Sequence, residues 1–188
     1  MRRRGALAAV LNAVLLLPAF AFSPARESVH GWSFFALVSL FAWLEAASAG
    51  ALDVSTGRAS RGPAATGLAL LVVFATALVA ASADGGWWTL GLGAIAMLLG
   101  IALRRAAMVA LGPAFVSELR PLTRNDRVVT GPYAWLEHPS EIGLLLLASG
   151  AVLVLESTPA AIVGAVTLLP IVLARMRHES RAQRADTM

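Results

Sequence analysis

Residues 64–83 have the sequence AATGLALLVVFATALVAASA, a run of twenty residues without a charged side chain. A helix of about 20 apolar residues is long enough to cross the ~30 Å hydrocarbon core of a bilayer. Five similar segments accompany it, at residues 6–22, 31–52, 87–103, 142–155 and 160–174. The whole chain is 58% hydrophobic and 14% charged, whereas soluble domains carry about 25% charged residues. The sequence therefore predicts an all-α, polytopic transmembrane bundle of five to six membrane segments.

The 188 residues leave no room for a separate soluble domain of ordinary size, so we predict a single membrane domain over residues 1–188. Residues 6–22 follow Met1-Arg-Arg-Arg and have the shape of a signal peptide. Because similar blocks follow and residues 22–25 form a poor cleavage site, we expect a retained first transmembrane helix. The last two segments are each shorter than ~20 residues and only four residues separate them, which predicts a helical hairpin.

The arginines set the expected orientation. With the N-terminus inside and every segment crossing, fourteen of the fifteen basic residues fall on the inner side, and only Arg26 lies outside. Such a bias is typical of cytoplasmic loops, so both termini are predicted to be cytoplasmic. The chain has no lysine and is rich in Ala, Gly and Arg, which suggests a bacterial inner membrane protein. Contact of these arginines with membrane lipids explains the pI of 11.2 without nucleic acid.

One predicted cytoplasmic loop, residues 104–141, is 38 residues long, and loops of that length in compact proteins are usually functional or disordered. Residues 106–111 are expected to continue the preceding helix. The stretch 131–143, GPYAWLEHPSEIG, then places Tyr133, Glu137, His138 and Glu141 within nine residues. Its Gly-Pro and His-Pro pairs impose turns and extended geometry. We therefore expect these side chains on a stiff non-helical segment at the membrane surface.

Other candidates have plainer interpretations beside the functional one. Glu45 lies inside an apolar segment, where a carboxylate contacts substrate or protons, or is partly hydrated near the headgroups; Asn12 is a weaker case. Gly91, Gly93 and Gly100 lie within an apolar helix, so helix packing is expected rather than nucleotide binding. Arg175 and Glu179 are four residues apart and would pair on one helix face. The chain has no cysteine and no visible metal-ligand spacing, so no metal is expected.

The C-terminal half resembles the isoprenylcysteine carboxyl methyltransferase family, which groups with the phospholipid methyltransferases. The resemblance covers about residues 100–180 and rests on five ordered elements: Leu103-Arg104-Arg-Ala-Ala107, Leu111-Gly112-Pro-Ala-Phe115, Val128-Val-Thr-Gly-Pro-Tyr133, Glu137-His138-Pro139-Ser140-Glu141-Ile142-Gly143 and Arg175-Met176-Arg-His-Glu179-Ser180. It divides the chain into N-terminal transmembrane helices, residues 1–100, and a methyltransferase-like half, residues 101–188.

The resemblance implies a cytoplasmic cofactor cleft that binds S-adenosylmethionine and a lipophilic acceptor that enters from the bilayer. The implied cofactor-binding residues are Gly131, Pro132, Tyr133, His138, Pro139, Arg175 and Glu179. His138 and Glu137 are the candidate catalytic bases, and Glu45, Trp135 and Glu141 the candidate substrate contacts. The expected acceptor is a phenolic or isoprenoid lipid, a carboxylate or a headgroup amine.

Three positions depart from the family pattern. Glu137 replaces its arginine before His-Pro, Glu141 replaces its tyrosine two residues after that proline, and Ser180 replaces its second glutamate. The Glu137 carboxylate would repel an acceptor that is itself a carboxylate. It is suited to act as the base that removes a proton from a phenol or an amine. A non-catalytic scaffold or transporter subunit is the main alternative. A membrane reductase with a nicotinamide cofactor is the other, since some membrane sterol reductases resemble this C-terminal architecture.

Overall fold

The computed structural model describes residues 14–49, 61–82, 85–112 and 129–185, and every regular element in these ranges is helical. Residues 14–21 form a helix that leads into the 3-10 turn η1. The elements that follow are η1 (Pro24–Glu27), α2 (Val29–Ala49), α3 (Arg61–Val79), α4 (Trp87–Leu111), η4 (Gly131–Ala134), α5 (Pro139–Leu155), α6 (Thr158–Val163), η5 (Gly164–Leu168) and α7 (Leu169–Ala185). The expectation of an all-α fold is confirmed for the described residues, and Asn12 lies outside them.

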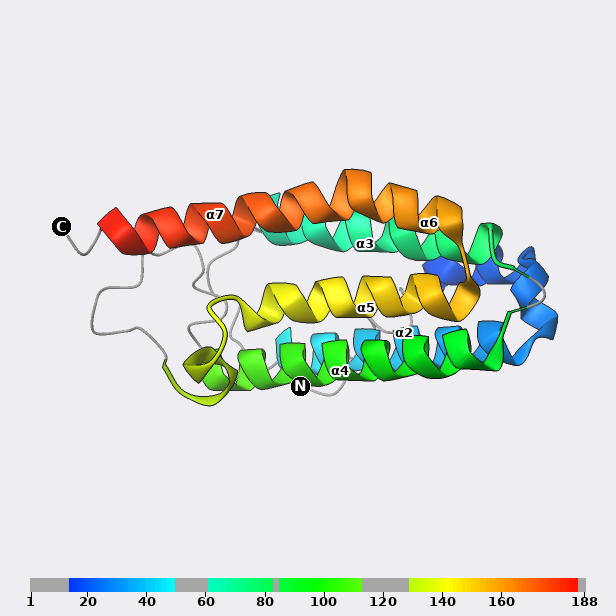
Figure 1. Cartoon of the computed structure of the whole chain (residues 1–188), viewed down its shortest axis with the longest axis horizontal. Helices are drawn as coiled ribbons and strands as arrows, with labels where there is room; N and C mark the ends of the chain where they lie inside the picture. The colour runs from blue at the N-terminus through cyan, green and yellow to red at the C-terminus, as the bar shows by residue number, and fades with distance from the viewer. Residues whose placement is uncertain (1–13, 50–60, 83–84, 113–128, 186–188) are drawn as a thin grey trace.

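Helix α5 is the centre of the bundle. It packs against α2, α3, α4, α6 and α7, and Figure 1 shows it between α4 and α2 on one side and α3 and α7 on the other. Its sequence is apolar around most of its circumference after the first turn, as expected for a helix with neighbours on several sides, and most of its residues are buried. The position of α5 therefore fixes the positions of the other helices.

Glycines allow α4 and α5 to approach each other closely. A Cβ atom on Gly100 would lie 2.5 Å from the carbonyl oxygen of Gly143, and one on Gly150 would lie 2.6 Å from that of Gly93. Small residues at such crossings are a common means of helix packing in membranes. The predicted packing role is confirmed for Gly93 and Gly100, whereas a Cβ atom on Gly91 would meet open space, with nothing within 4 Å.

The last helix is longer than the apolar segment that predicted it. Elements α6, η5 and α7 form one continuous helix, which extends through residues 175–185 beyond the apolar segment 160–174. The element η5 is a π-helical turn in which the N–H of Leu169 bonds to the carbonyl of Gly164. Pro170 follows at once. Because proline has no N–H to donate and crowds the preceding turn, a widened turn at this point accommodates it.

The connections between the helices lie at the two ends of the bundle. The Arg104 end holds the C-terminal ends of α2, α4 and α7 and the N-terminal ends of α3 and α5; the Glu156 end holds η1 and the turns before α4 and α6 (Figure 1). This alternation agrees with the predicted topology. Among the described residues, Trp87–Leu111 and Thr158–Arg177 are long and apolar enough to cross a membrane, while α2, α3 and α5 hold shorter apolar stretches. The number of spans stays a prediction.

Hydrogen bonds between turns close the Glu156 end. The hydroxyl of Ser23 donates to the carbonyl oxygen of Leu78 at 2.5 Å. The N–H of Ser82 donates to the carbonyl oxygen of Leu155 at 2.9 Å. Glu156 lies in the turn after α5 with φ 47° and ψ 39°. Its carboxylate accepts the Thr89 hydroxyl at 2.5 Å and the Gly86 N–H at 2.8 Å. These bonds join the start of α4 to the end of α5.

The same contacts lower the pKa of Glu156. The hydrogen bond from the Thr89 hydroxyl lowers this pKa most, and the hydrogen bond from the Gly86 N–H lowers it further. Desolvation raises the pKa, and the charge of His30 makes a smaller lowering contribution. A carboxyl group with a lowered pKa in the folded state stabilises the fold above its unfolded pKa. That stabilisation is lost as the pH falls through the folded pKa.

Gly100→Ala is expected to lower the free energy of unfolding by about 1–3 kcal/mol, because its methyl group would overlap the backbone of α5. Gly91→Ala in the same helix is the matched control and should cause no loss. The measurement is unfolding by sodium dodecyl sulfate in mild detergent, followed by circular dichroism. Equal stabilities of the two variants would contradict the close packing of α4 on α5.

Glu156→Gln is expected to lower stability at neutral pH and to make the loss of stability on acidification shallower than in the wild type. The reason is that the glutamine cannot supply the charge that Thr89 and Gly86 stabilise. Thermal unfolding midpoints measured from about pH 7 down to about pH 3 test this, a range that spans the titration of an ordinary carboxyl group. Glu27→Gln, at an exposed position of the same end, should leave the acid profile unchanged, and parallel profiles for Glu156→Gln and the wild type would refute the expectation.

Candidate active site

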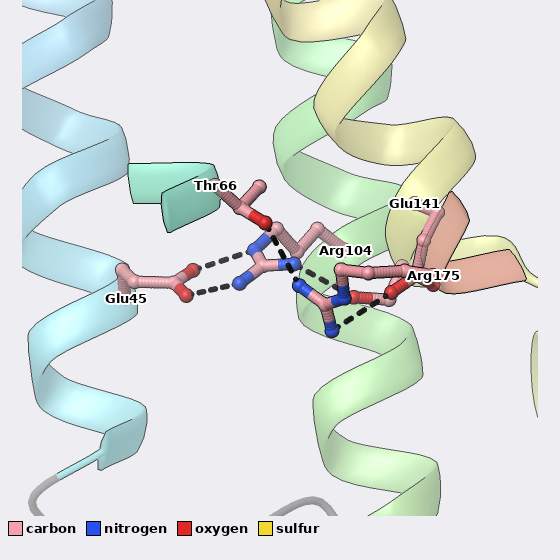
Figure 2. Close-up of polar contacts among 6 residues, drawn as sticks. Glu45, Thr66, Arg104, Glu141 and Arg175 are labelled. Atoms are coloured by element: carbon pink, nitrogen blue, oxygen red, sulfur yellow. Dashed lines mark hydrogen bonds and ion pairs between the residues drawn. The ribbon is translucent and has the colours of Figure 1, made fainter. Parts of the chain in front are cut away.

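Charged and hydroxyl side chains from five helices meet at the Arg104 end of the bundle. Figure 2 shows them as two arginine-centred groups that lie side by side. Each group contains one arginine, one carboxylate and one hydroxyl, each from a different helix. Such clusters in apolar surroundings are stable only when every charge and donor has a partner.

The first group is centred on Arg104, near the end of α4. Its Nε donates to Oε2 of Glu45 at 2.8 Å, and its Nη2 pairs with the other oxygen of the same carboxylate. Its Nη1 donates to the hydroxyl of Ser140 at 2.7 Å. The Arg104 side chain is 13% exposed and the Glu45 side chain is 31% exposed. This two-pronged geometry, which only arginine can provide, ties α2 and α5 to α4.

The second group is centred on Arg175 in α7. Its Nη2 lies 3.2 Å from Oε1 of Glu141, and its Nη1 donates to the hydroxyl of Thr66 at 3.1 Å (Figure 2). The Glu141 side chain is 5% exposed and that of Arg175 is 23% exposed. The contacts tie α3 and α5 to α7. Glu141 therefore carries a buried charge that Arg175 compensates.

Helix α5 links the two groups, because Ser140 and Glu141 are consecutive residues in its first turn. Pro139 precedes them at the start of the helix, where a proline costs no hydrogen bond and presets the helical φ. A carboxylate in the first turn is also favoured by the positive end of the helix dipole. The start of α5 is thus the point at which both sides of the bundle are joined.

The turn before α5 carries the remaining sequence candidates. Gly131 has φ 61° and Pro132 follows it in the 3-10 turn η4. Tyr133 is half-buried, while Trp135 and Glu137 are exposed. His138 is the residue before α5, is 6% exposed, and accepts the Ile142 N–H at its carbonyl oxygen. The turn therefore presents an aromatic ring and a carboxylate outwards and keeps its histidine inside.

The structure corrects one expectation about this stretch. Glu141 does not lie on the non-helical segment with Tyr133, Glu137 and His138, because α5 begins at Pro139. The His-Pro pair marks the start of a helix rather than the middle of an extended segment, since proline is favoured at the first helical position. As a result, the side chain of Glu141 is buried in the bundle and pairs with Arg175.

The other predicted residues are brought together in part. His138, Pro139 and Glu141 lie next to one another at the start of α5, and Arg175 of α7 pairs with Glu141. Glu45 lies at the same end, in the Arg104 group. Glu179 lies on α7, but its side chain is outside the described part, so a pair with Arg175 stays a prediction.

Sequence reasoning missed the roles of Thr66, Arg104 and Ser140. One signal was available for Arg104: a carboxylate such as Glu45 within an apolar helix requires a cation or water at the same depth. Arg104 is the first charged residue after the apolar segment 87–103 and lies at the same predicted side. No comparable signal exists for Thr66, because hydroxyl residues in apolar helices commonly bond to their own backbone.

Comparison with known proteins gives one finding. The model of the family described as isoprenylcysteine carboxyl methyltransferase (ICMT) family matches residues 92–184, which confirms the resemblance seen in the sequence. The matched region runs from α4 through α7 and includes both arginines, Ser140 and Glu141, but neither Glu45 nor Thr66. No curated protein and no solved structure matches the chain.

A double-mutant cycle with Glu45→Ala and Arg104→Ala is expected to give a coupling energy of about 1–3 kcal/mol. The value should fall below the ~3–5 kcal/mol lost on breaking a fully buried pair, because Glu45 is partly exposed. The unfolding free energies of the four proteins in detergent give the coupling. A parallel cycle with Glu45→Ala and Arg105→Ala, whose arginine is the next residue along α4, should give a value near zero. Equal couplings in the two cycles would contradict the geometry.

Proposed function

Because the chain belongs to the isoprenylcysteine carboxyl methyltransferase family through residues 92–184, we propose that it transfers a methyl group from S-adenosylmethionine to a lipophilic, membrane-resident acceptor. Membership in this family makes the chain a membrane protein of the methyltransferase class. The two long apolar helices agree with that. The cofactor, the acceptor and the orientation of the site are parts of the proposal.

The observation that carries the proposal is the ion pair between Arg175 and Glu141. In the sequence the two clusters assigned to the cofactor, residues 131–139 and 175–179, are separated by the α5 helix and the turn after it. The ion pair places Arg175 against the first turn of α5, two residues after Pro139. The two clusters therefore lie at one end of the bundle, which is what a shared binding site requires.

The residues at this end fit the chemistry of S-adenosylmethionine. The cofactor carries a carboxylate, an ammonium group, a sulfonium and an adenine ring. Arg175 and His138 are suited to its anionic part, Glu137 and Glu179 to its cationic parts, and Tyr133 to its ring. The backbone of Gly131, Pro132 and Pro139 would line the same site. Gly131 adopts a positive φ that a side chain would strain.

When bound, the cofactor supplies a methyl group on a good leaving group, so this chain has little covalent chemistry to perform. Its main task is to hold a water-soluble donor and a bilayer-soluble acceptor in line, which is catalysis by proximity and orientation. A carboxylate acceptor requires no base. For a phenol or an ammonium group, His138 or Glu137 would remove the proton. Trp135, exposed beside Glu137 on the same turn, would contact the lipophilic part of the acceptor.

The proposed orientation places the Arg104 end in the cytoplasm, where the donor is available. Within the described residues, Arg26 is the only arginine at the Glu156 end. That distribution supports the cytoplasmic placement of the Arg104 end under the positive-inside rule. The proposal accordingly has both termini and the active site on the cytoplasmic side of a bacterial inner membrane, with five to six helices crossing it.

Binding of S-adenosylmethionine to the detergent-purified full chain, measured by calorimetry, tests the proposal. We expect a dissociation constant in the micromolar range, which corresponds to a binding free energy of about −8 kcal/mol. The affinity should fall by at least ~100-fold in His138→Ala and Glu179→Ala. Glu27→Ala at the opposite end is the matched control and should bind like the wild type. A folded wild type that binds no S-adenosylmethionine would refute the proposal, and binding of a nicotinamide cofactor instead would favour a reductase.

A further inference from the structure

Glu45 connects α2 to the part of the chain that carries the proposed cofactor residues. Both oxygens of its carboxylate contact the guanidinium of Arg104: Oε2 accepts from Nε at 2.8 Å, and Oε1 pairs with Nη2. The same guanidinium donates from Nη1 to the Ser140 hydroxyl at 2.7 Å. Figure 2 shows the carboxylate reaching the arginine from α2. Because both oxygens accept from Arg104, the geometry favours an orienting role for Glu45 over direct contact with a substrate.

The stretch from Gly131 to Ser140, here called the His138 turn, is held by the end of α4 on both sides. On the later side, Ser140 lies two residues after His138, in the first turn of α5, and is 2% exposed. On the earlier side, a Cβ atom on Gly131 would lie 3.5 Å from the Cβ atom of Ala110, so η4 is in contact with the last turn of α4. The hydrogen bond from Arg104 to Ser140 is therefore one of two attachments between α4 and the His138 turn.

The backbone of Arg104 is fixed against α5, so the partners of its side chain set the direction of the guanidinium. A Cβ atom on Gly143 would lie 3.0 Å from the backbone nitrogen of Arg104 and 3.1 Å from its Cβ atom. A long arginine side chain has many rotamers, and it loses most of them when it holds one hydrogen bond. A carboxylate that accepts two parallel N–H bonds fixes the plane of the guanidinium as well as its position. Glu45 therefore helps to hold Nη1 in the direction of Ser140.

We propose that Glu45 is a positioning residue: through Arg104 and Ser140 it holds the His138 turn in the geometry that binds the cofactor. The inference rests on the proposed function, since it concerns the same site. Glu45 lies outside the region that matches the family, which begins at residue 92, so the site would depend on α2 as well. A displacement of 1 Å in a reactive site can cost about 100-fold in rate, so small movements of this turn matter.

The first measurement is backbone hydrogen exchange of the detergent-purified full chain without cofactor, read from peptides at the starts of α5 and α4. Amides exchange faster where the local structure opens more often, and the Ile142 N–H, which bonds to the His138 carbonyl oxygen at 3.1 Å, lies in the first of these peptides. Glu45→Ala should raise exchange at the start of α5 at least about fivefold, which corresponds to ~1 kcal/mol, and Glu45→Gln should raise it less. Neither should change exchange at the start of α4. Glu156→Gln, which removes the charge that accepts the Gly86 N–H, should give the opposite pattern.

The second measurement is the affinity of the same proteins for S-adenosylmethionine, by calorimetry. Glu45→Ala should lower the affinity at least about tenfold, which corresponds to ~1.4 kcal/mol. Glu45→Gln keeps one acceptor oxygen for the arginine, should lower the affinity less, and serves if the alanine variant does not fold. Arg104 takes part in further interactions, so its orientation is expected to be lost only in part. Glu156→Gln is the matched control: it destabilises the opposite end and should bind like the wild type.

A double variant tests whether Glu45 acts along the proposed chain of contacts. Ser140→Ala removes the hydroxyl that accepts from Arg104, and it should lower the affinity for S-adenosylmethionine in the same direction as Glu45→Ala. Because both changes interrupt one chain of contacts, the double variant should bind little more weakly than the weaker single variant. The effects of Glu45→Ala and Glu156→Gln, at opposite ends of the bundle, should add.

Unchanged exchange at the start of α5, or wild-type affinity for the cofactor, in folded Glu45→Ala or Glu45→Gln protein would overturn the inference. Losses of affinity that add in the Glu45→Ala, Ser140→Ala double variant would also overturn it. So would an equal loss in Glu156→Gln, because general destabilisation would then be sufficient. A wild type that binds no S-adenosylmethionine, with exchange responding to Glu45 as expected, would instead refute the proposed methyl transfer and leave the hold on the His138 turn supported. The two failures are therefore distinguishable.

Discussion

Two consecutive residues in the first turn of α5, Ser140 and Glu141, connect the two sides of the bundle. Ser140 accepts a hydrogen bond from Arg104, which holds α2 through Glu45, and Glu141 pairs with Arg175, which also bonds to Thr66 of α3. Charges among apolar helices require partners, so each arginine admits few arrangements of its neighbours. The relative positions of five helices at the Arg104 end follow from this constraint.

The network also assigns a role to the N-terminal half. The family match begins at residue 92, so α2 and α3 lie outside it. Each nevertheless supplies a partner of one arginine, a carboxylate for Arg104 and a hydroxyl for Arg175. The N-terminal helices therefore complete the polar groups of the C-terminal half. The Glu156 end is built differently, with short turns joined by backbone and side-chain hydrogen bonds and no comparable group of paired arginines among its described residues.

The sequence was sufficient for the local structure and insufficient for the contacts between helices. The apolar runs predicted the helices, residues 106–111 were expected to continue α4, which ends at Leu111, and Gly93 and Gly100 predicted close packing. Pairs such as Glu45 with Arg104 and Thr66 with Arg175 depend on which helices become neighbours, 59 and 109 residues apart in the chain. Glu141 was misplaced because His-Pro fits both an extended segment and a helix start.

The central claim, that the cofactor binds at the Arg104 end, can be tested most directly by protection of single cysteines, since the chain has none of its own. Ala134 is exposed in η4 and Glu27 is exposed at the opposite end. The rate at which a hydrophilic maleimide labels Ala134→Cys and Glu27→Cys would be measured with and without S-adenosylmethionine. Our account predicts that the cofactor slows labelling at position 134 and not at position 27. Unchanged labelling at 134 with saturating cofactor, or protection confined to position 27, would contradict it.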